Sequence, residues 1–522
     1  MASAAMPLIP LLVLFAPVVT ALVVVTSRTT AKRRDAALVA GAVVTFGLVA
    51  SLVPGVLRGE TPTVELVEAL PGFTLALRVD GMALVFTLLA AFLWVLASPY
   101  AIGYLRGDGA KHQTRFLAFY ALCLSTAFGV AMAADLLTFF VFYELLTIAT
   151  YPLVTHKGNA EAIAAGRRYL AYLVAGGALV LIATTVLYQQ TGELGFQPGG
   201  FVGDSLSGGV VAITFLLFAI GFGTKAGLMP LHAWLPAAMV APTPVSALLH
   251  AVAVVKAGVF AFGRLIGFVF GPDVLAAVGI HLVIMLVAAA TIVIASSIAL
   301  RQDHLKRRLA YSTIAHLAYI VLGFSLLSQT AFEGSLLHIM NHGVLKITLF
   351  FAAGALHVHL HLDHVSELDG VGRKMPLTMG AFALAALGLA GLPIMGGFLS
   401  KWHLVLGAYE SEAAWAALVM TGSGLLTAGY LFPVVHRAFF RPSRDRVGAE
   451  HVTSGAHSAG AHSAVGLAPA GSAPSRWSDA DPRMVLPLVT TAALGLLLGL
   501  GDLFGVYHLA DMVAAAVFGG AG

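Results

Sequence analysis

The stretch DLLTFFVFYELLTIATYPLV, residues 135–154, is apolar enough to lie in lipid, yet Glu144 stands in its middle. The stretch has the length of a helix that crosses a membrane. An unpaired carboxylate inside the hydrocarbon core costs several kcal/mol, so Glu144 must gain something from its position. The fold must therefore place a partner for Glu144 within the membrane.

The composition extends this conclusion to the whole chain. Of its 522 residues, 59% are hydrophobic and 10% are charged, which is more apolar surface than a soluble protein can bury. The apolar runs recur at about 20 residues, the length needed to cross a ~30 Å hydrocarbon core as a helix. Strands of a membrane barrel would be shorter and would alternate. The sequence predicts an all-α polytopic membrane protein.

We expect about fourteen transmembrane helices. The first run, residues 6–26, has no basic residue ahead of it and is long for a signal-peptide core, so it is interpreted as a retained span. The expected spans lie near residues 6–26, 36–57, 81–104, 116–133, 135–155, 169–190, 208–229, 242–268, 274–300, 308–328, 333–356, 376–407, 414–436 and 484–506.

The basic residues give the expected orientation. The chain has 29 Lys and Arg. If the N-terminus lies outside, the outer loops hold Arg58, Arg78 and Arg264, and the spans hold Lys225, Lys256, Lys346 and Lys401. Every other basic residue then falls in a cytoplasmic loop, as the positive-inside rule requires. We expect a multi-pass protein of a bacterial-type inner membrane with both termini outside.

Several classes of function are disfavoured. Cys123 is the single cysteine, which excludes a disulfide framework and clusters held by several thiolates. The stretch GFGTKAG lacks the glycine before the lysine and the hydroxyl after it that a phosphate loop needs. The modest excess of basic residues is spread among loops, so nucleic acid is not expected as a partner. We expect no cofactor and no redox centre.

Two stretches are not expected to cross the membrane. Residues 61–79 alternate around a central Pro-Gly, which predicts an external hairpin. Residues 441–482 are rich in Ser, Ala, Gly and Pro, which predicts a flexible cytoplasmic loop before the last span, at residues 483–522. The histidines of this loop are interpreted as part of a solvated low-complexity segment rather than as metal ligands.

Two expected spans contain helix breakers beside a lysine. They are FAIGFGTKAGLMPLHAWLP with Lys225 and LAALGLAGLPIMGGFLSKWHLV with Lys401. Interrupted helices are tolerated where they line a protein or water cavity, and a pair of them in corresponding halves indicates a transport site built from inverted repeats. The two spans are the seventh and the twelfth, so they run in opposite directions. Packing glycines would explain the breaks but not the lysines.

Titratable residues within the spans are the candidate site. His338, His342 and Lys346 stand four apart and share one helical face, as a proton relay requires. A metal site on His338 and His342 is less favoured, because Lys346 would repel the cation. For His316, a role as a hydrogen-bonded core histidine is as well supported as a role in the site. Arg264 lies near the boundary of its span and is expected to extend to the interface. The full set is Glu144, Lys225, His250, Lys256, His316, His338, His342, Lys346 and Lys401.

Two further expectations concern charge. Glu144 paired with a lysine of another helix would hold that lysine protonated, and separation of the pair would release the proton; the sequence leaves open which lysine it is. The segment HVHLHLDHVSELDG gathers His357, His359, His361, Asp363 and His364. It is interpreted as a polar helix end that collects protons, with zinc binding as the less favoured alternative.

At these residues the chain resembles a known family, the antiporter-like subunits shared by Mrp-type cation/proton antiporters, respiratory complex I and membrane-bound hydrogenases. The matching stretches include DLLTFFVFYELLT, GTKAGLMPLHAWLPAAMVAPTPVSALLHAVAVVKAG, QDHLKRRLAYSTIAHLAYIVLG, LLHIMNHGVLKITLFFAAG and GRKMPLTMGAFALAALGLAGLPIMGGFLSKW, within residues 80–440. The resemblance implies fourteen helices with two inverted five-helix repeats, which we place at residues 111–270 and 271–440, after N-terminal helices at residues 1–110.

The resemblance also implies roles. Glu144 and Lys225 would form the switching pair, and Glu144 would communicate with a neighbouring subunit. Lys256 and His250 would link two half-channels, and Lys401 would end an axis that His338, His342 and Lys346 continue. Lys401 differs from the glutamate of some complex I members and is closer to Mrp-type members.

Three functions remain open from the sequence. The first is the proton-translocating subunit of a multisubunit monovalent cation/proton antiporter, with protons, sodium or another monovalent cation, other membrane subunits and the lipid bilayer as partners. The second is a proton-pumping membrane subunit of a complex I-like NADH:quinone oxidoreductase or a membrane hydrogenase. The third is the membrane partner of a proton-driven inorganic-carbon uptake complex.

Overall fold

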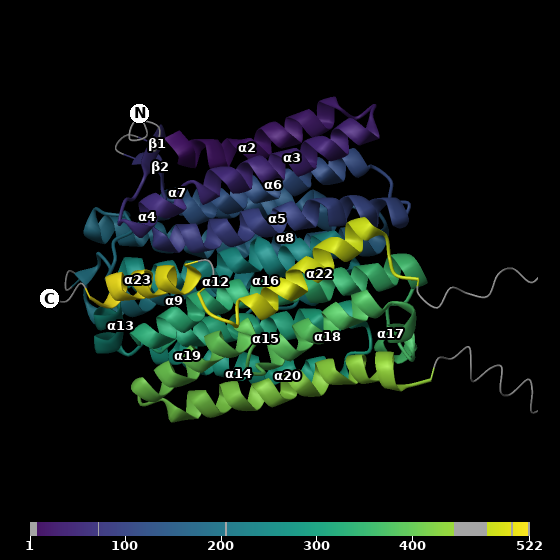
Figure 1. Ribbon diagram of the computed structural model, residues 1–522. Coiled ribbons are helices and arrows are strands. Elements are labelled where there is room, and N and C mark those ends of the chain that lie inside the picture. The colour runs from purple at the N-terminus through teal and green to yellow at the C-terminus, as the bar shows by residue number, and fades with distance from the viewer. Residues whose placement is uncertain (1–7, 71–72, 204–205, 443–477, 503–504, 520–522) are drawn as a thin grey trace, which may run out of the picture.

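The fold is a single bundle of long helices, seen in a computed structural model that describes residues 8–70, 73–203, 206–442, 478–502 and 505–519 (Figure 1). The helices lie side by side, with α2 (Ile9–Thr26) and α3 (Ala31–Ala50) at one edge and α20 (Ala414–Phe440) at the other. The helix α16 (Gln329–Leu360) lies inside the bundle, where it packs against α15 (Leu305–Ser325) and α5 (Gly81–Gly107). This arrangement surrounds α16 with other helices.

The remaining elements complete the bundle. They are α4 (Val53–Leu57), α6 (Gln113–Met132), α7 (Leu136–Val154), α8 (Ala160–Thr191), α9 (Gly208–Ala226), α10 (Trp234–Ala237), η3 (Ala238–Val240), α11 (Thr243–Ala247), η4 (Leu248–Val252), α12 (Val254–Arg264), η5 (Leu265–Phe270), α13 (Pro272–Val278), α14 (His281–Arg301), η6 (Val365–Glu367), α17 (Val371–Lys374), α18 (Pro376–Ala390), α19 (Gly396–Glu410), α22 (Pro482–Leu497) and α23 (Val506–Phe518).

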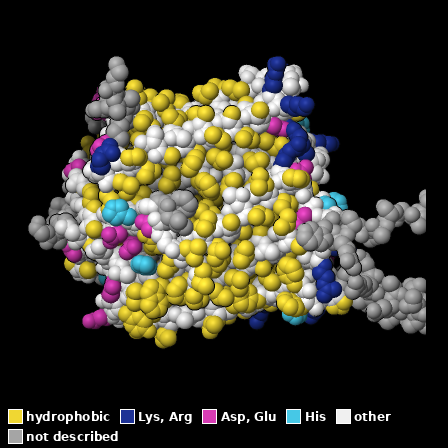
Figure 2. All heavy atoms as spheres, viewed as in Figure 1, with side chains coloured by type: hydrophobic (Ala, Val, Ile, Leu, Met, Phe, Trp, Pro, Cys, Tyr) yellow, Lys and Arg dark blue, Asp and Glu magenta, His cyan; other side chains and the backbone are white. Residues whose placement is uncertain are grey.

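The surface confirms a multi-pass membrane protein. Figure 2 shows an apolar band between two polar ends, with most of the visible Lys and Arg at the end of the bundle where α20 ends and α22 begins. Within the described residues, eleven helical stretches are long and apolar enough to span a membrane, and α18, α22 and α23 are shorter apolar helices. The start of α2 and the end of α23 both lie at the other end of the bundle, away from the end that holds most of the visible Lys and Arg (Figure 1). The fourteen spans and their repeats remain a prediction.

The expected hairpin is present. Strands β1 (Thr63–Leu70) and β2 (Phe73–Arg78) pair antiparallel, with Thr63 opposite Arg78. Asp80, two residues after β2, caps α5 by accepting a hydrogen bond from the Ala83 N–H (2.9 Å). Its carboxylate also accepts two hydrogen bonds from Arg264, at 2.6 and 2.8 Å. The Arg264 side chain is 2% exposed in this ion pair, and its extension to the interface stays a prediction.

Both predicted helix breaks are seen. The helix α9 ends at Ala226, one residue after Lys225, and is followed by Gly227, whose φ of 73° is readily adopted by glycine. The expected span at residues 376–407 consists of α18 and α19, separated by Gly391–Met395. Each break therefore lies beside the lysine that the sequence indicates.

Two irregular spans are not predicted by the sequence. The expected span at residues 242–268 contains two π-helical segments, η4 and η5, and Ala253 between η4 and α12 has non-helical angles of φ −109° and ψ −84°. The expected last span at residues 484–506 is instead α22, and a second helix, α23, follows. Gly501 and Gly505, with φ of 135° and 66°, separate the two. The sequence at Ala253 contains no proline or glycine that would have indicated a break.

A close helix contact positions two of the candidate lysines. A Cβ atom at Gly258 of α12 would lie 2.4 Å from the Ala226 nitrogen and 2.8 Å from the Lys225 carbonyl carbon of α9. These are backbone atoms, which cannot move aside without shifting a helix. The absence of a side chain at Gly258 thus allows α9, with Lys225, to lie against α12, with Lys256.

We expect Gly258→Ala to lower the free energy of unfolding by about 1–3 kcal/mol, because the added methyl group must separate α9 from α12. Gly380→Ala in α18 is the control, since nothing lies within 4 Å of its Cβ position. Thermal unfolding of both variants in detergent checks this prediction, and equal midpoints would contradict it.

Candidate functional site

The predicted titratable residues lie inside the bundle. Seven of them are buried, each with 1% or less of its surface exposed: Lys225, His250, Lys256, His316, His338, His342 and Lys346. Glu144 and Lys401 are half-buried. Burial of this kind in a membrane protein requires polar partners, so the contacts of each group define the site.

Lys225 lies against α7 rather than in an ion pair. Its Nζ donates hydrogen bonds to the Tyr143 carbonyl oxygen (2.5 Å) and the Thr147 hydroxyl (3.0 Å), and it lies 3.3 Å from the centre of the Tyr143 ring. Glu144 follows Tyr143 on the same helix, yet no ion pair within 4 Å joins Glu144 to Lys225 among the described residues. Lys225 of α9 therefore binds the turn of α7 that carries Glu144, without an ion pair between the two side chains.

Glu144 lies where α7 meets α8. A Cβ atom at Gly177 of α8 would lie 2.3 Å from the Glu144 Oε1, so the carboxylate occupies space that this glycine leaves open. The Oε1 atom has no hydrogen-bond partner among the described residues. The neighbouring Leu145 and Ile148 are 42% and 62% exposed. Glu144 thus lies close to the lateral surface of the bundle.

Lys256 directly contacts His342, one of the histidines that share a face of α16. Its Nζ lies 2.8 Å from the His342 Nδ1, which joins α12 to α16. Lys256 lies in the first turn of α12, just after the irregular backbone at Ala253, and His250 belongs to the π-helical segment on the other side of that break. His250 packs against the Phe350 ring (4.8 Å between centroids), and neither of its ring nitrogens has a partner among the described residues.

Three histidines and a tyrosine form an aromatic cluster at the centre. The His316 Nδ1 lies 3.2 Å from the His338 Nε2, and the His338 Nδ1 lies 2.9 Å from the Ser400 hydroxyl. The centroid of the His316 ring lies 5.6 Å from that of His342 and 5.2 Å from that of Tyr319. The cluster joins α15, α16 and α19.

The remaining lysines are held by backbone carbonyls. Lys401 donates to the Leu389 and Ala390 carbonyl oxygens (2.7 and 3.3 Å), at the C-terminal end of α18, where the helix dipole favours a cation. Lys346 donates to the Leu309 carbonyl oxygen of α15 (3.2 Å). The helix break between α18 and α19 thus supplies the acceptors for Lys401.

The sequence alone predicts only part of this cluster. It favours a core role and a site role for His316 equally, and it does not identify Ser400 and Tyr319 as members. The structure places His316 beside both His338 and His342, which also lie next to each other (6.0 Å between ring centroids). The available signal is local, since Ser400 adjoins Lys401 and Tyr319 follows His316 by one helical turn, but only the packing of three helices brings them together.

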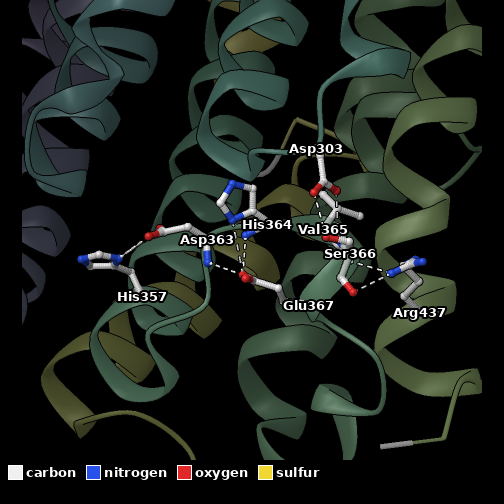
Figure 3. Close-up of polar contacts among 8 residues, drawn as sticks. All are labelled: Asp303, His357, Asp363, His364, Val365, Ser366, Glu367 and Arg437. Carbon is white, nitrogen blue, oxygen red and sulfur yellow. Dashed lines mark hydrogen bonds and ion pairs between the residues drawn. The ribbon is translucent and has the colours of Figure 1, made fainter. Parts of the chain in front are cut away.

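The segment after α16 forms a polar network of a different kind (Figure 3). His357 contacts Asp363 (3.0 Å) and Asp108 (3.5 Å), and the hydrogen bond from His357 lowers the pKa of Asp363. Glu367 accepts hydrogen bonds from the backbone of Asp363 and His364, and Ser366 joins Asp303 to Arg437. The network ties the connection between α14 and α15 to α16 and α20 at the basic end of the bundle.

These contacts bear on the metal alternative. Figure 3 shows His357 and His364 directed to different acidic partners. Within the described ranges no group of three or more His, Cys, Asp or Glu side chains is arranged to hold a metal ion. The histidines of the 441–482 segment lie outside the described residues.

Comparison with known proteins identifies the family. Residues 133–427, more than half of the chain, match the family described as NADH:quinone oxidoreductase/Mrp antiporter, TM. The chain belongs to this family. The resemblance inferred from the quoted motifs is confirmed, and the matched range contains every candidate site residue.

Individual members of the family support the same assignment. NADH-quinone oxidoreductase subunit N of Desulforudis audaxviator is 37% identical, over 71% of this chain and 74% of its own. One subunit of the Na(+)/H(+) antiporter of Alkalihalophilus pseudofirmus is 28% identical, over 70% of this chain and 74% of its own. A chain of the Mrp complex from Dietzia sp. DQ12-45-1b has the same fold, with a TM-score of 0.82, 23% identity and coverage of 98% and 97%.

We expect Thr147→Val to lower the free energy of unfolding by about 1–3 kcal/mol, because it removes a hydrogen bond to a buried cationic group while keeping the shape of the side chain. Thr184→Val is the matched control, since the buried Thr184 hydroxyl donates only to its own helix, at the Val180 carbonyl. Thermal unfolding of the purified chain measures the difference, and an equally large loss in the control would refute the role of Thr147.

Proposed function

We propose that the chain is the proton-translocating subunit of a multisubunit monovalent cation/proton antiporter in a bacterial-type inner membrane, with both termini outside. The observation that carries the proposal is the line of contacts from Lys256 through His342, His316 and His338 to Ser400, the neighbour of Lys401. It lies within a bundle whose other interior side chains are mostly apolar.

Such a line is chemically suited to proton transfer. A neutral imidazole has one nitrogen that donates and one that accepts, so a proton received at one nitrogen can leave from the other. The His316 Nδ1 and His338 Nε2 lie 3.2 Å apart, within hydrogen-bond reach. The His316 and His342 Nε2 atoms lack protein partners among the described residues, and buried polar atoms of this kind are usually satisfied by water.

Electrostatics couples the members of the line. Lys256 and His342 are in direct contact, and a positive charge on one opposes a positive charge on the other in a medium of low dielectric constant. The described acceptors of Lys225, Lys346 and Lys401 are neutral oxygens. In the proposed mechanism these groups therefore lose and gain protons in turn, rather than all being charged at once.

Glu144 and Lys225 act as the switch in this proposal. Lys225 is bound to the turn of α7 that carries Glu144, so a small movement of α7 or a rotation of the Glu144 side chain would change the distance between the charges. The exposed Leu145 and Ile148 beside Glu144 offer a surface for a neighbouring membrane subunit. Arrival of a charge in that subunit would thereby influence Lys225.

The proposed domain organisation follows the helix breaks. We assign residues 111–270 and 271–440 to two inverted five-helix repeats, each with a helix that breaks beside a lysine, Lys225 or Lys401. Residues 1–110 precede them with the hairpin on the outer side. The line of contacts would then cross between the two repeats along α12, α15 and α16.

A second candidate is the proton-pumping membrane subunit of a complex I-like oxidoreductase. The 37% identity to NADH-quinone oxidoreductase subunit N over most of both chains favours it. Both functions require the same line of titratable groups. Co-purification from membranes distinguishes them, because partners that bind NADH or quinone would support the second candidate, and a large soluble zinc-containing partner would support a role in inorganic-carbon uptake.

We expect Glu144→Ala and Lys225→Ala to lower cation-dependent proton transport to roughly a tenth or less. Each variant removes one charge of the switching pair, and a tenfold effect corresponds to an interaction of about 1.4 kcal/mol between the two charges. Everted membrane vesicles with a pH-sensitive dye measure the transport, after assembly of each variant is verified. The exposed Glu161→Ala and Lys32→Ala are the controls. Full activity in both test variants would refute the switch.

The central cluster gives a separate prediction. His316→Phe keeps an aromatic ring beside His338 and His342 but removes both ring nitrogens, including the Nδ1 that lies 3.2 Å from the His338 Nε2. We expect proton transport about tenfold or more below the wild type, because the buried His338 loses a partner. His508→Phe, at an exposed position of α23, is the control. Transport at the wild-type rate in His316→Phe would exclude His316 from the path.

A further inference from the structure

A basic cavity lies at the end of the bundle where α5 and α7 end and α6 and α8 begin. Its volume is about 340 Å³. The polar side chains that line it are those of Asp108, Lys111, His112, Arg115, His156 and Lys157. None of these residues belongs to the line of contacts described above, and the inference that follows does not depend on the proposed function.

The charge of the cavity is not balanced from within the described chain. Lys111, Arg115 and Lys157 are exposed, and no described carboxylate lies within ion-pair distance of them. The acidic residue in the lining, Asp108, is directed to His357 at 3.5 Å. The cavity therefore presents three cationic side chains to whatever enters it.

His156 provides an independent indication of a ligand. The residue is 7% exposed, and its Nε2 lies 3.0 Å from the Lys111 carbonyl oxygen, so this nitrogen carries a hydrogen and donates it. The other nitrogen, Nδ1, is buried and has no partner among the described residues. Burial and the nearby Arg115 lower the pKa of His156, and an anion in the cavity would oppose that effect. The unused nitrogen can accept from a protonated anion or, once protonated, donate to one.

The start of α6 adds backbone donors. The residue before its first turn, His112, makes no side-chain cap, and the first turn holds no acidic residue. The first N–H groups of a helix lack partners within the helix and attract anions. The α6 helix has 20 residues, so its dipole is fully developed.

We propose that this cavity binds a phosphate group, carried either by an anionic phospholipid of the adjoining leaflet or by free phosphate. Lys111, Arg115 and Lys157 would neutralise the charge, and the His156 Nδ1 and the α6 N-terminus would bind the oxygens. Basic cavities between helix ends suit phosphate head groups, and arginine in particular binds phosphate through its planar guanidinium group.

Two probes separate the sources in the purified full-length chain. Binding of inorganic phosphate is measured by calorimetry, and binding of phosphatidylglycerol by native mass spectrometry from micelles of equimolar phosphatidylcholine and phosphatidylglycerol. The test variant is K111Q/R115Q/K157Q, and the matched control is R28Q/K32Q/R33Q, which removes three exposed charges from the neighbouring α2–α3 turn.

We expect the test variant to bind its ligand roughly a hundredfold more weakly, and the control to stay within about twofold of the wild type, because exposed charges outside the cavity are screened. Preference for phosphatidylglycerol without phosphate binding identifies a lipid site, and phosphate binding without lipid preference identifies a free-phosphate site. Binding of neither probe, or an equal loss in the control, overturns the proposal.

A charge-preserving variant guards against a purely structural effect. K111R/K157R keeps the charges and should retain binding, whereas the single reversal Lys157→Glu should remove it. Loss of binding in K111R/K157R, with an unchanged unfolding temperature, would overturn the proposal even if the triple variant cannot be purified.

Discussion

The structure depends on how a lysine is kept in an apolar bundle. A charged amine in hydrocarbon is expensive, and the described contacts show neutral oxygens or an imidazole rather than carboxylates around it. Lys225 binds a carbonyl and a hydroxyl of α7, Lys346 binds a carbonyl of α15, and Lys401 binds two carbonyls of α18. Such acceptors solvate the amine in either protonation state, which a carboxylate would not do, since it would hold the proton.

Irregular backbone serves this purpose for Lys401, whereas the backbone acceptors of Lys225 and Lys346 lie within α7 and α15. A regular helix uses nearly all of its carbonyls internally, whereas its last turn leaves them free. The end of α18 supplies both acceptors of Lys401, and the break at Ala253 separates His250 from Lys256. Ala253 is fully buried among other helices, which is where a break in a membrane-spanning helix is tolerated.

The two ends of the bundle are built differently from its centre. At one end Asp80 joins the hairpin and α5 to Arg264 through a paired carboxylate and guanidinium. At the other, the network of Figure 3 links the connection between α14 and α15 to α16 and α20 through hydrogen bonds of side chains with one another and with backbone. The ion pair at one end and the hydrogen-bonded network at the other fix the structure, whereas the neutral contacts of the central lysines suit groups that change their protonation.

The sequence by itself determined the class of the protein, the two broken helices beside Lys225 and Lys401, the hairpin, and the helical stripe of His338, His342 and Lys346, because these depend on composition, on glycine and proline, and on the periodicity of one helix. Only the tertiary structure decided that Lys256 contacts His342, that His316 lies beside two other histidines and that Ser400 binds His338. It also decided that Lys225 binds the turn of α7 that carries Glu144, without an ion pair between the two. These contacts join residues of separate helices, and their distances follow from how closely the helices pack, as at Gly258, which no local pattern reveals.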